Sequence, residues 1–178
     1  MSQKKTLVFN KERDVRRFVQ NLKVYATKAL DDALTDVAHA IESQAIANLA
    51  MPYVAPGKDS GAKDTGRLMA GFRGIRDEKL HKTVGNNVSY AAHMEYGTGP
   101  AAGRPKYRPP DGALAGWAGR HGKEELDVGK TIWNRGTYPR RYLGRAFHTK
   151  KPLIKTKFFK HFTKRLSLAS GLGLPDLK

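Results

Sequence analysis

The feature that most constrains the fold is a long stretch, residues 11–49, that contains neither glycine nor proline. Apolar residues recur in it every three or four positions, for example at Val15, Leu22, Val37 and Leu49. This spacing is the period of an amphipathic α-helix. The sequence therefore predicts one long helix over about 11–49, which would extend for about 50 Å at 1.5 Å per residue. Such a helix either packs across a small sheet with one end frayed or also contacts neighbouring subunits.

The stretch 83–100, with the sequence TVGNNVSYAAHMEYGTGP, shows a different period. Its alternate positions are apolar or aromatic: Val88, Tyr90, Ala92, Met94 and Tyr96. An alternation of this kind predicts a half-buried β-strand, and the glycines and asparagines on both sides of it predict turns. Because the connections around it are too short for crossover helices, we expect it to belong to a small, mainly antiparallel sheet at about 67–98.

The same stretch carries a family resemblance. The run from Tyr90 to Gly99, YAAHMEYGTG, resembles the "YA..vE.GTG" signature of the tail-completion, or head-tail joining, family of tailed bacteriophages, which includes relatives of the minor tail protein Z of phage lambda. Two further blocks agree in order: 64–68 (DTGRL) resembles the upstream "TG.L" block, and 139–147 (PRRYLGRAF) resembles the downstream "p.pfl..A" block. The signature residues are Tyr90, Ala91, Glu95, Tyr96, Gly97, Thr98 and Gly99.

The resemblance implies a function and a set of partners. It implies a structural protein of the virion, in the phage neck or upper tail, that forms a homo-oligomeric ring and joins the DNA-filled head, at its connector, to the tail during assembly. The implied partners are further copies of the chain, adjacent neck and tail proteins, and DNA that passes through the channel and is contacted without sequence specificity. It also implies synthesis in the cytoplasm of the host bacterium. In this interpretation the turn Gly97–Gly99 either serves the sheet alone or faces the next subunit.

The chain has a large excess of positive charge. Its 33 lysines and arginines outnumber its 16 acidic residues, which gives a net charge of +17. The excess is concentrated at the C-terminal side, since residues 1–100 carry +4 and residues 101–178 carry +13. A field of this sign attracts nucleic acid, an anionic membrane surface or an acidic protein, and composition does not choose among them. We predict that Arg140, Arg141 and Arg145 serve electrostatic docking.

The region 130–165 supports an alternative function. It holds twelve lysines and arginines interleaved with aromatic residues. Basic side chains give salt-dependent affinity for phosphates, and exposed aromatic rings can stack on unpaired bases. The alternative is therefore a basic nucleic-acid-binding module. Within the predicted C-terminal helix, however, the aromatic residues fall on the apolar stripe, which favours a place in the core over a place on nucleic acid.

The sequence shows no constellation of catalytic residues. Cysteine is absent, which excludes disulfides and thiolate chemistry. The six histidines lack the spacing of zinc enzymes, and no phosphate-binding loop or nucleophile elbow occurs. His93 and Glu95 would share one face of the predicted strand and could serve acid-base chemistry, but a surface pair is the ordinary interpretation. We therefore expect no enzymatic activity, no metal and no cofactor.

These observations predict an α+β fold. A long N-terminal helix and a C-terminal helix pack on a small, mainly antiparallel sheet, with extended loops rich in proline and glycine. One domain covers 1–170, in the order long helix (about 11–49), loop (51–66), sheet (about 67–98), loop and short helices (99–136) and C-terminal helices (about 141–168). Residues 171–178 are expected to form a flexible tail. No apolar run approaches the ~20 residues that span a bilayer, so we expect a protein of an aqueous compartment with no membrane partner.

Overall fold

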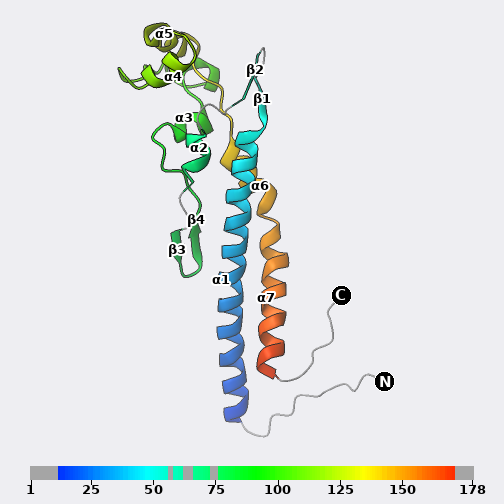
Figure 1. Ribbon diagram of the computed structural model, residues 1–178. Helices are drawn as coiled ribbons and strands as arrows, with labels where there is room; N and C mark the ends of the chain where they lie inside the picture. Colours follow the sequence, from blue (N-terminus) through cyan, green and yellow to red (C-terminus); the bar gives the residue numbers. More distant parts are fainter. Residues whose placement is uncertain (1–11, 56–57, 62–65, 73–75, 171–178) are drawn as a thin grey trace. The chain divides into compact units, whose positions relative to one another are not determined.

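The computed structural model describes residues 12–55, 58–61, 66–72 and 76–170, and these residues are mostly helical (Figure 1). The helices are α1 (Glu12–Ala50), α2 (Arg67–Ala70), α3 (Ala91–Tyr96), the 3₁₀ helix η1 (Pro100–Ala102), α4 (Ala115–Arg120), α5 (Glu125–Arg135), α6 (Tyr142–Lys150) and α7 (Leu153–Ser170). The strands are β1 (Pro52–Ala55), β2 (Lys58–Gly61), β3 (Arg76–Glu78) and β4 (His81–Thr83).

The described residues divide into two compact units. Unit 1 contains residues 12–40, 76–83 and 150–170, and unit 2 contains the described residues of 41–72 together with 84–149. The sequence predicted a single domain over 1–170, whereas the contacts within the chain group its residues into these two units. The predicted tail, 171–178, lies outside the described residues.

The predicted α+β fold is wrong. The described strands form two separate two-stranded hairpins and no larger sheet on which helices could pack. In the first hairpin β1 runs antiparallel to β2, with Pro52 opposite Gly61, and in the second β3 runs antiparallel to β4, with Arg76 opposite Thr83. The region predicted as a sheet consists of α2, the β3–β4 hairpin and α3, and the region predicted as the loop 51–66 contains the β1–β2 hairpin.

The strand predicted from the alternation at 88–96 is also wrong, because Ala91–Tyr96 form the helix α3. The two buried residues of α3 are Ala91 and Glu95, which lie one helical turn apart. Tyr90 and Tyr96, which a strand would have turned inward, are exposed. In a stretch this short, the apolar residues fit both the two-residue period of a strand and the 3.6-residue period of a helix. Here the helical period decides which side chains are buried.

The long helix predicted over about 11–49 is confirmed as α1, which begins at Glu12 and ends at Ala50. Its buried apolar residues include a series at steps of four: Ala29, Ala33, Val37, Ile41, Ala45 and Leu49. This series forms one continuous stripe that slowly winds around the helix. Among the described residues, no helix combines the length and the apolar character that are needed to cross a membrane.

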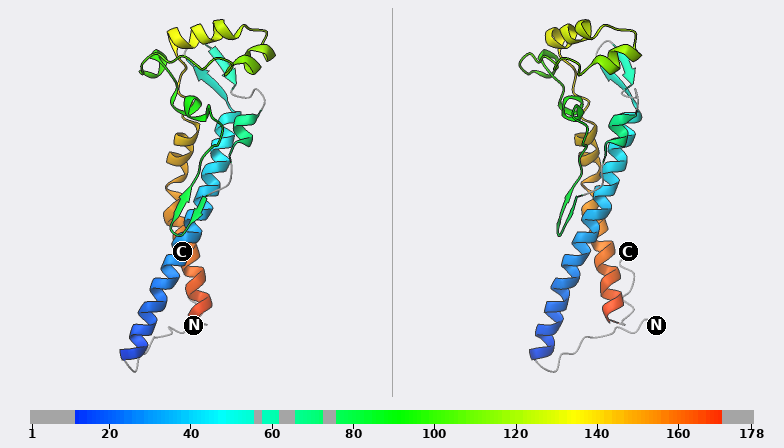
Figure 2. Two further views of the ribbon diagram at one scale, coloured as in Figure 1. Left: turned by 90° about the vertical axis from the view of Figure 1, so that its left-hand side faces the viewer. Right: turned by 60° about the vertical axis from the view of Figure 1, so that its left-hand side comes forward.

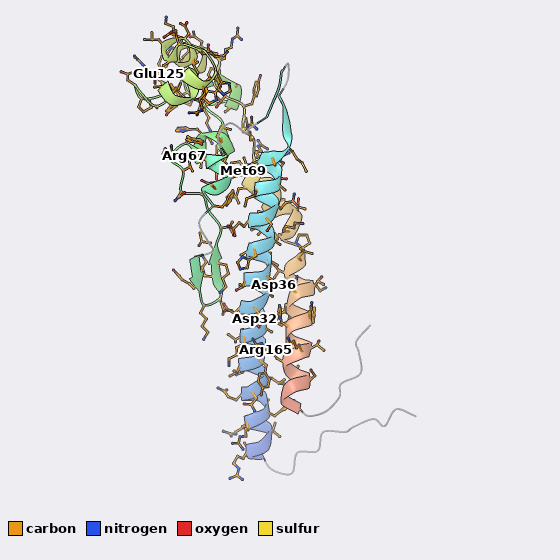
Figure 3. The ribbon with its side chains drawn as sticks, in the orientation of Figure 1. Asp32, Asp36, Arg67, Met69, Glu125 and Arg165 are labelled. Carbon is orange, nitrogen blue, oxygen red and sulfur yellow. The ribbon has the colours of Figure 1, made fainter. Side chains whose placement is uncertain are left out.

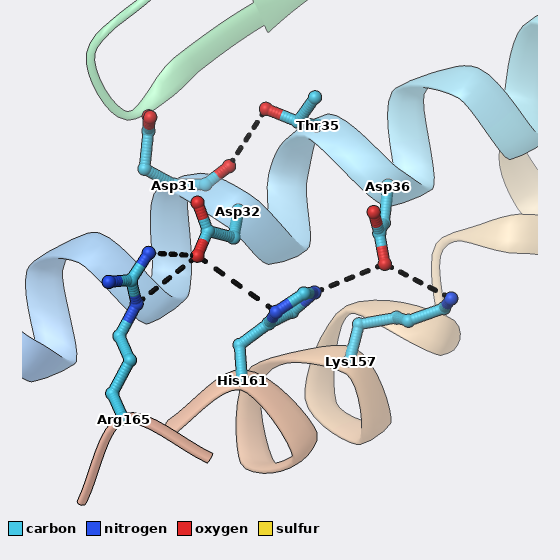
Figure 4. Close-up of polar contacts among 7 residues, drawn as sticks. All are labelled: Asp31, Asp32, Thr35, Asp36, Lys157, His161 and Arg165. Atoms are coloured by element: carbon cyan, nitrogen blue, oxygen red, sulfur yellow. Dashed lines mark hydrogen bonds and ion pairs between the residues drawn. The ribbon is translucent and has the colours of Figure 1, made fainter. Parts of the chain in front are cut away.

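In unit 1, α7 lies alongside the first part of α1 and runs in the opposite direction (Figure 2). Basic side chains of α7 meet acidic side chains of α1 (Figures 3 and 4). Arg165 pairs with Asp32, and the Asp36 carboxylate lies 3.1 Å from both His161 Nε2 and Lys157 Nζ. The side chains of these pairs are between 23% and 39% exposed, so each pair contributes at most about 1 kcal/mol to stability. Their main effect is to fix the register of the two helices.

The β3–β4 hairpin of unit 1 is attached to α1 through Asp31. The Asp31 carboxylate accepts a hydrogen bond of 2.7 Å from the Leu80 backbone N–H and lies 3.0 Å from Lys82 Nζ. The hydrogen bond from Leu80, followed by that from Lys82, lowers the pKa of Asp31. The Lys82 side chain is only 3% exposed, and its ammonium is satisfied by this carboxylate together with the Glu78 carbonyl oxygen, at 3.2 Å.

The Asp36 contact generates a prediction about pH. The hydrogen bond from His161 is the main cause that lowers the pKa of Asp36 below 3.8, with Lys157 acting in the same direction and burial opposing both. Asp36 therefore stabilises the folded state fully above pH 3.8, and this contribution is lost as the pH falls through its lowered value. We expect an NMR titration of the Asp36 carboxyl to show a midpoint below 3.8, and His161→Ala to raise that midpoint toward 3.8. The exposed His148→Ala is the matched control and should leave it unchanged. A midpoint at or above 3.8 in the unsubstituted protein would show that the contact does not form.

Candidate functional site around Glu95

The best-defined polar site of unit 2 is the buried carboxylate of Glu95, which is 7% exposed. Its two oxygens accept hydrogen bonds from the backbone N–H groups of Leu143, at 2.9 Å, and Gly144, at 2.8 Å. Both donors lie in the first turn of α6, where backbone N–H groups have no partner within the helix. The partial positive charge of a helix N-terminus also favours a carboxylate. Glu95 thus caps α6 and satisfies its own buried charge at the same time.

Backbone hydrogen bonds join the segment 94–98 to the segment 137–141. The N–H groups of Arg140 and Arg141 donate to the carbonyl oxygens of Met94 (2.9 Å) and Glu95 (3.0 Å). Thr98 and Thr137 exchange two backbone hydrogen bonds of 3.0 and 2.9 Å, and their hydroxyls lie 2.9 Å apart. The end of α3 and the start of α6 are therefore connected through the main chain as well as through the Glu95 carboxylate.

The glycines of this region allow the two segments to approach closely. Gly97 and Gly136 have φ values of 68° and 78°, which L-residues with a side chain rarely adopt. A Cβ atom on Gly97 would collide with the Thr137 carbonyl oxygen, and one on Gly136 would collide with the Thr98 carbonyl oxygen. The motif Gly97-Thr98-Gly99 is thus required by a backbone contact inside unit 2.

Tyr142 is the central aromatic residue of this core, at 2% exposed. Its ring meets Phe72 edge to face, with centroids 6.1 Å apart, and its hydroxyl donates to the Ala91 carbonyl at 3.4 Å. Burial, followed by the nearby Glu95 charge, raises the pKa of Tyr142 to about 12. Asn48 of α1 donates to the Tyr142 carbonyl at 2.9 Å. Tyr142 and Ala146 of the downstream block, 139–147, are therefore buried in unit 2, whereas its Phe147 is 46% exposed.

The upstream block reaches the same unit. Leu68 of α2 is buried, and its carbonyl accepts a hydrogen bond of 2.6 Å from the Asn86 side chain. Gly66, which precedes α2, adopts the left-handed conformation with φ 73°. Asp64 and Thr65, the first two residues of this block, lie outside the described residues. The described parts of all three blocks thus belong to unit 2.

The predicted signature residues divide into buried and exposed groups. Ala91, Glu95 and Thr98 are buried, and Gly97 and Gly99 lie in the backbone contact described above. Tyr90 and Tyr96 are exposed, at 39% and 56%. The Arg104 guanidinium lies over the Tyr96 ring, 5.4 Å from its centroid. Most of the signature therefore has a structural role, and its two tyrosines are available at the surface.

The predicted docking arginines differ in exposure. The side chains of Arg141 and Arg145 are exposed, whereas that of Arg140 is partly buried. Arg141 has a φ of 49°, and its backbone N–H is used by the Glu95 carbonyl. Two of the three side chains thus lie at the surface of unit 2.

The geometry argues against acid-base chemistry by the pair His93 and Glu95. The two residues were expected to share a strand face, but α3 places them about 200° apart around the helix axis. The His93 ring packs on Tyr107, with centroids 4.6 Å apart, and both Glu95 oxygens are occupied by backbone N–H groups. Within the part of the chain that the structure describes, no group of three potential metal ligands occurs.

Several residues of these sites were missed from the sequence. Asn48 and Asn86 hold backbone carbonyls through their side chains, which leaves no pattern in a sequence. The ion pairs between α1 and α7 do leave a pattern in the sequence. Asp32 and Asp36 are four residues apart, and Lys157, His161 and Arg165 are also spaced by four. Two helices with such complementary spacing are candidates for pairing.

Comparisons with known proteins identify no protein that is similar to this chain. The chain matches no family model, and no curated protein or solved structure is significantly similar to it. The resemblance to the phage tail-completion family therefore rests on the three sequence blocks alone. What the structure adds is where the residues of these blocks lie.

The Glu95 cap predicts a loss of stability when the carboxylate is changed. Glu95→Gln replaces one acceptor oxygen by an NH₂ group that faces a backbone N–H, so one buried donor loses its partner. We expect the free energy of unfolding to fall by about 1–3 kcal/mol in urea denaturation. Glu124→Gln, an exposed residue whose side chain makes no capping bond, is the control and should change it by less than about 0.5 kcal/mol. Equal effects of the two changes would contradict the cap.

The backbone contact predicts opposite effects for two glycine substitutions. Gly136→Ala meets both the unfavourable φ and the Thr98 carbonyl, and we expect it to destabilise the fold by about 1–3 kcal/mol. Gly129→Ala lies inside α5 with open space around it, and we expect it to stabilise by about 0.5–1 kcal/mol. Thermal unfolding should therefore show midpoints shifted in opposite directions. A shift in the same direction would mean that Gly136 is not constrained as described.

Proposed function

We propose that this chain is a structural virion protein of the phage neck or upper tail, which forms a homo-oligomeric ring and joins the DNA-filled head to the tail. The observation that carries the proposal is that residues of two of the three sequence blocks, 90–99 and 139–147, meet in unit 2. Glu95 of the block 90–99 caps α6, which begins within the block 139–147. Tyr142 of the block 139–147 donates a hydrogen bond to the Ala91 carbonyl of the block 90–99. Two blocks that are far apart in the sequence thus share one structural task, which supports treating them as parts of one signature.

The chemistry of the site supports a non-enzymatic role. The Glu95 carboxylate is bound by backbone N–H groups on both oxygens, and the Tyr142 hydroxyl is buried with its pKa raised to about 12. Neither group is placed to exchange a proton with a substrate at neutral pH. Both groups instead make a rigid connection between helices. A rigid scaffold without a reacting group is what a joining protein needs.

The surface of unit 2 offers patches for assembly. A groove of about 430 Å³ is lined by the loop 108–111 and by one face of α5. Leu126 and Trp133 in this groove are 68% and 42% exposed, which is costly for large apolar side chains unless a partner covers them. The Lys106 ammonium lies 5.7 Å from the centroid of the Trp133 ring. In a ring such a patch would meet a different patch of the next subunit, because ring interfaces are heterologous.

One observation favours a second candidate, a basic nucleic-acid-binding module. On α7, the side chains of Lys155, Lys160 and Lys164 are exposed and make no ion pair within the described residues. Phe159, on the same helix, is 53% exposed. Free cations beside an exposed ring suit a phosphate backbone with unpaired bases. The same features also suit DNA that passes through the channel of a ring.

The proposal predicts a ring that depends on the groove. Native mass spectrometry should show a closed oligomer, with a mass that is a multiple of 19.8 kDa for the protein alone and that multiple plus the bound partner when an adjoining neck protein is added. Leu126→Glu places a charge in the groove and should shift the population to monomers. Val24→Glu is the control, because it also replaces an exposed apolar side chain by a charged one but lies outside unit 2. It should leave the oligomer intact.

Two results would count against the ring. The first is a monomer that persists both alone and with the neck protein. The second is tight binding of duplex DNA by the monomer, at submicromolar affinity and with a steep dependence on salt, which would favour the nucleic-acid-binding module.

A further inference from the structure

The first part of α1 carries most of its cations on one side of the helix. Successive residues are about 100° apart around the axis, which places Arg13, Arg17 and Lys28 within about 60° of one another. Arg16 and Lys23 lie within about 80° of Arg13 on its other side. All of these side chains are exposed. We call the surface formed by Arg13, Arg16, Arg17, Lys23 and Lys28 the basic stripe, which extends for about 22 Å along α1 at 1.5 Å per residue.

The basic stripe is one surface, and little of its charge is neutralised. One open hollow at the start of α1 is lined by Arg13, Arg16, Arg17 and Gln20. Arg16 pairs with Glu12 at 2.6 Å. The other four cations of the stripe make no ion pair within the described residues. Their charges are therefore available to a ligand.

The turn of the β3–β4 hairpin continues the basic stripe. Asp31 lies on the same side of α1 as Arg13, because it comes about five full helical turns later. Figure 4 shows Asp31 on the side of α1 that faces the hairpin, apart from the residues that pair with α7. The Asp31 charge is neutralised by Lys82, at 3.0 Å. Lys79, in the same turn, is exposed and lies close enough to Asp31 for their charges to interact. A further cation thus follows the stripe.

We propose that the basic stripe is a contact surface for the phosphate backbone of duplex DNA. Cations distributed over about 22 Å can meet several phosphates of one strand, which follow one another at about 3.4 Å along the duplex axis. Such contacts give affinity through the release of counterions and carry no sequence information. The contact deepens the proposed function and rests on it for the source of the DNA, because DNA in the channel of a ring must be contacted without sequence specificity.

The position of the stripe argues against an anionic membrane as the ligand. A basic helix that binds a membrane inserts its apolar face beside the headgroups that its cations meet. Val15 and Val19 are 41% and 44% exposed, but they lie on the side of α1 opposite Arg13 and Arg17. A membrane that met the cations would therefore leave these apolar side chains pointing away from it.

The composition of the stripe argues against two other ligands. The uncharged residues in the same arc of the helix, between Arg13 and Lys28, are Gln20, Val24 and Thr27. An acidic protein would gain little from this surface, because water screens exposed ion pairs and the stripe offers little apolar area. Unpaired bases bind by stacking on aromatic rings, and this arc contains none. A duplex backbone needs neither apolar area nor aromatic rings.

The experiment uses the full chain and a fluorescein-labelled DNA duplex of mixed sequence, about twenty base pairs long, at several salt concentrations. We expect fluorescence anisotropy to show binding, with a log affinity that falls linearly with the log of the salt concentration. The stripe variant Arg13→Gln/Arg17→Gln/Lys28→Gln should weaken binding at least tenfold at about 50 mM salt. It should also reduce the salt slope by about 2–3, because each phosphate contact contributes about 0.9.

The matched control is Lys155→Gln/Lys160→Gln/Lys164→Gln. It removes the same amount of charge from exposed positions of α7, in the same unit. We expect it to weaken binding less than about threefold, because charges beyond a Debye length from the contact are screened. Circular dichroism on all three proteins checks that the helices remain folded.

Several outcomes would overturn the proposal. These are no salt-dependent binding of the duplex, and tighter binding of a single-stranded oligonucleotide of the same length. An equal loss in the two variants would show that binding follows net charge and not the basic stripe. Equal binding of polyglutamate would assign the stripe to acidic proteins. Binding of phosphatidylserine vesicles that the stripe variant alone loses, with no binding of the duplex, would assign it to membranes.

Native mass spectrometry of the same samples separates this inference from the proposed ring. A monomer that binds the duplex through the basic stripe would contradict the ring and support the stripe. A closed ring that does not bind the duplex would contradict only the stripe.

Discussion

The cap of α6 by the Glu95 carboxylate is the interaction on which the rest of unit 2 depends. The residues just before α6 are Arg140 and Arg141, and arginine has no acceptor atom with which to cap a helix. The first N–H groups of α6 therefore need an acceptor from elsewhere, and burial makes an unsatisfied donor costly. Glu95 provides it from α3. The last carbonyl groups of α3 and the first N–H groups of α6 are thus satisfied by each other's segments, so the two helices depend on one another.

This arrangement also brings together the two ends of a long segment, residues 98–137. Between Thr98 and Thr137, which exchange backbone hydrogen bonds, the chain makes η1, α4 and α5 and returns. Within this segment, the Glu125 carboxylate accepts a hydrogen bond of 3.0 Å from the Leu114 backbone N–H, which connects α5 to the residue before α4. The glycines at 97 and 136 allow the two ends to meet. A segment closed at its base in this way can vary in length and surface without disturbing the core, which suits it to partner contacts.

The sequence could predict what depends on periodicity and could not predict what depends on the backbone. The long helix α1 was predictable because its apolar spacing continues for ten turns without a glycine or proline. The strand at 88–96 was a wrong prediction because Glu95 was counted as an outward polar residue. Its burial is stabilised by N–H groups of Leu143 and Gly144, and any residue supplies a backbone N–H, so the pairing leaves no trace in residue types. The glycine motif was predicted as a turn at a strand end, but the collision it avoids, with Thr137, is visible only in three dimensions.

The excess positive charge is better understood once it is divided by environment. Lys157 and Arg165 are neutralised by aspartates of α1, and Arg104 and Lys106 lie over aromatic rings. The remaining exposed cations are spread over both units, on α1, α5, α6 and α7. On α1, the exposed Arg13, Arg17 and Lys28 lie on the side of the helix opposite Val15 and Val19, since successive residues are 100° apart around the axis. A surface that combines apolar area with one sign of charge discriminates in favour of partners that carry both the opposite charge and apolar side chains. For α1, the apolar stripe and most of the exposed cations therefore do not form one surface of this kind.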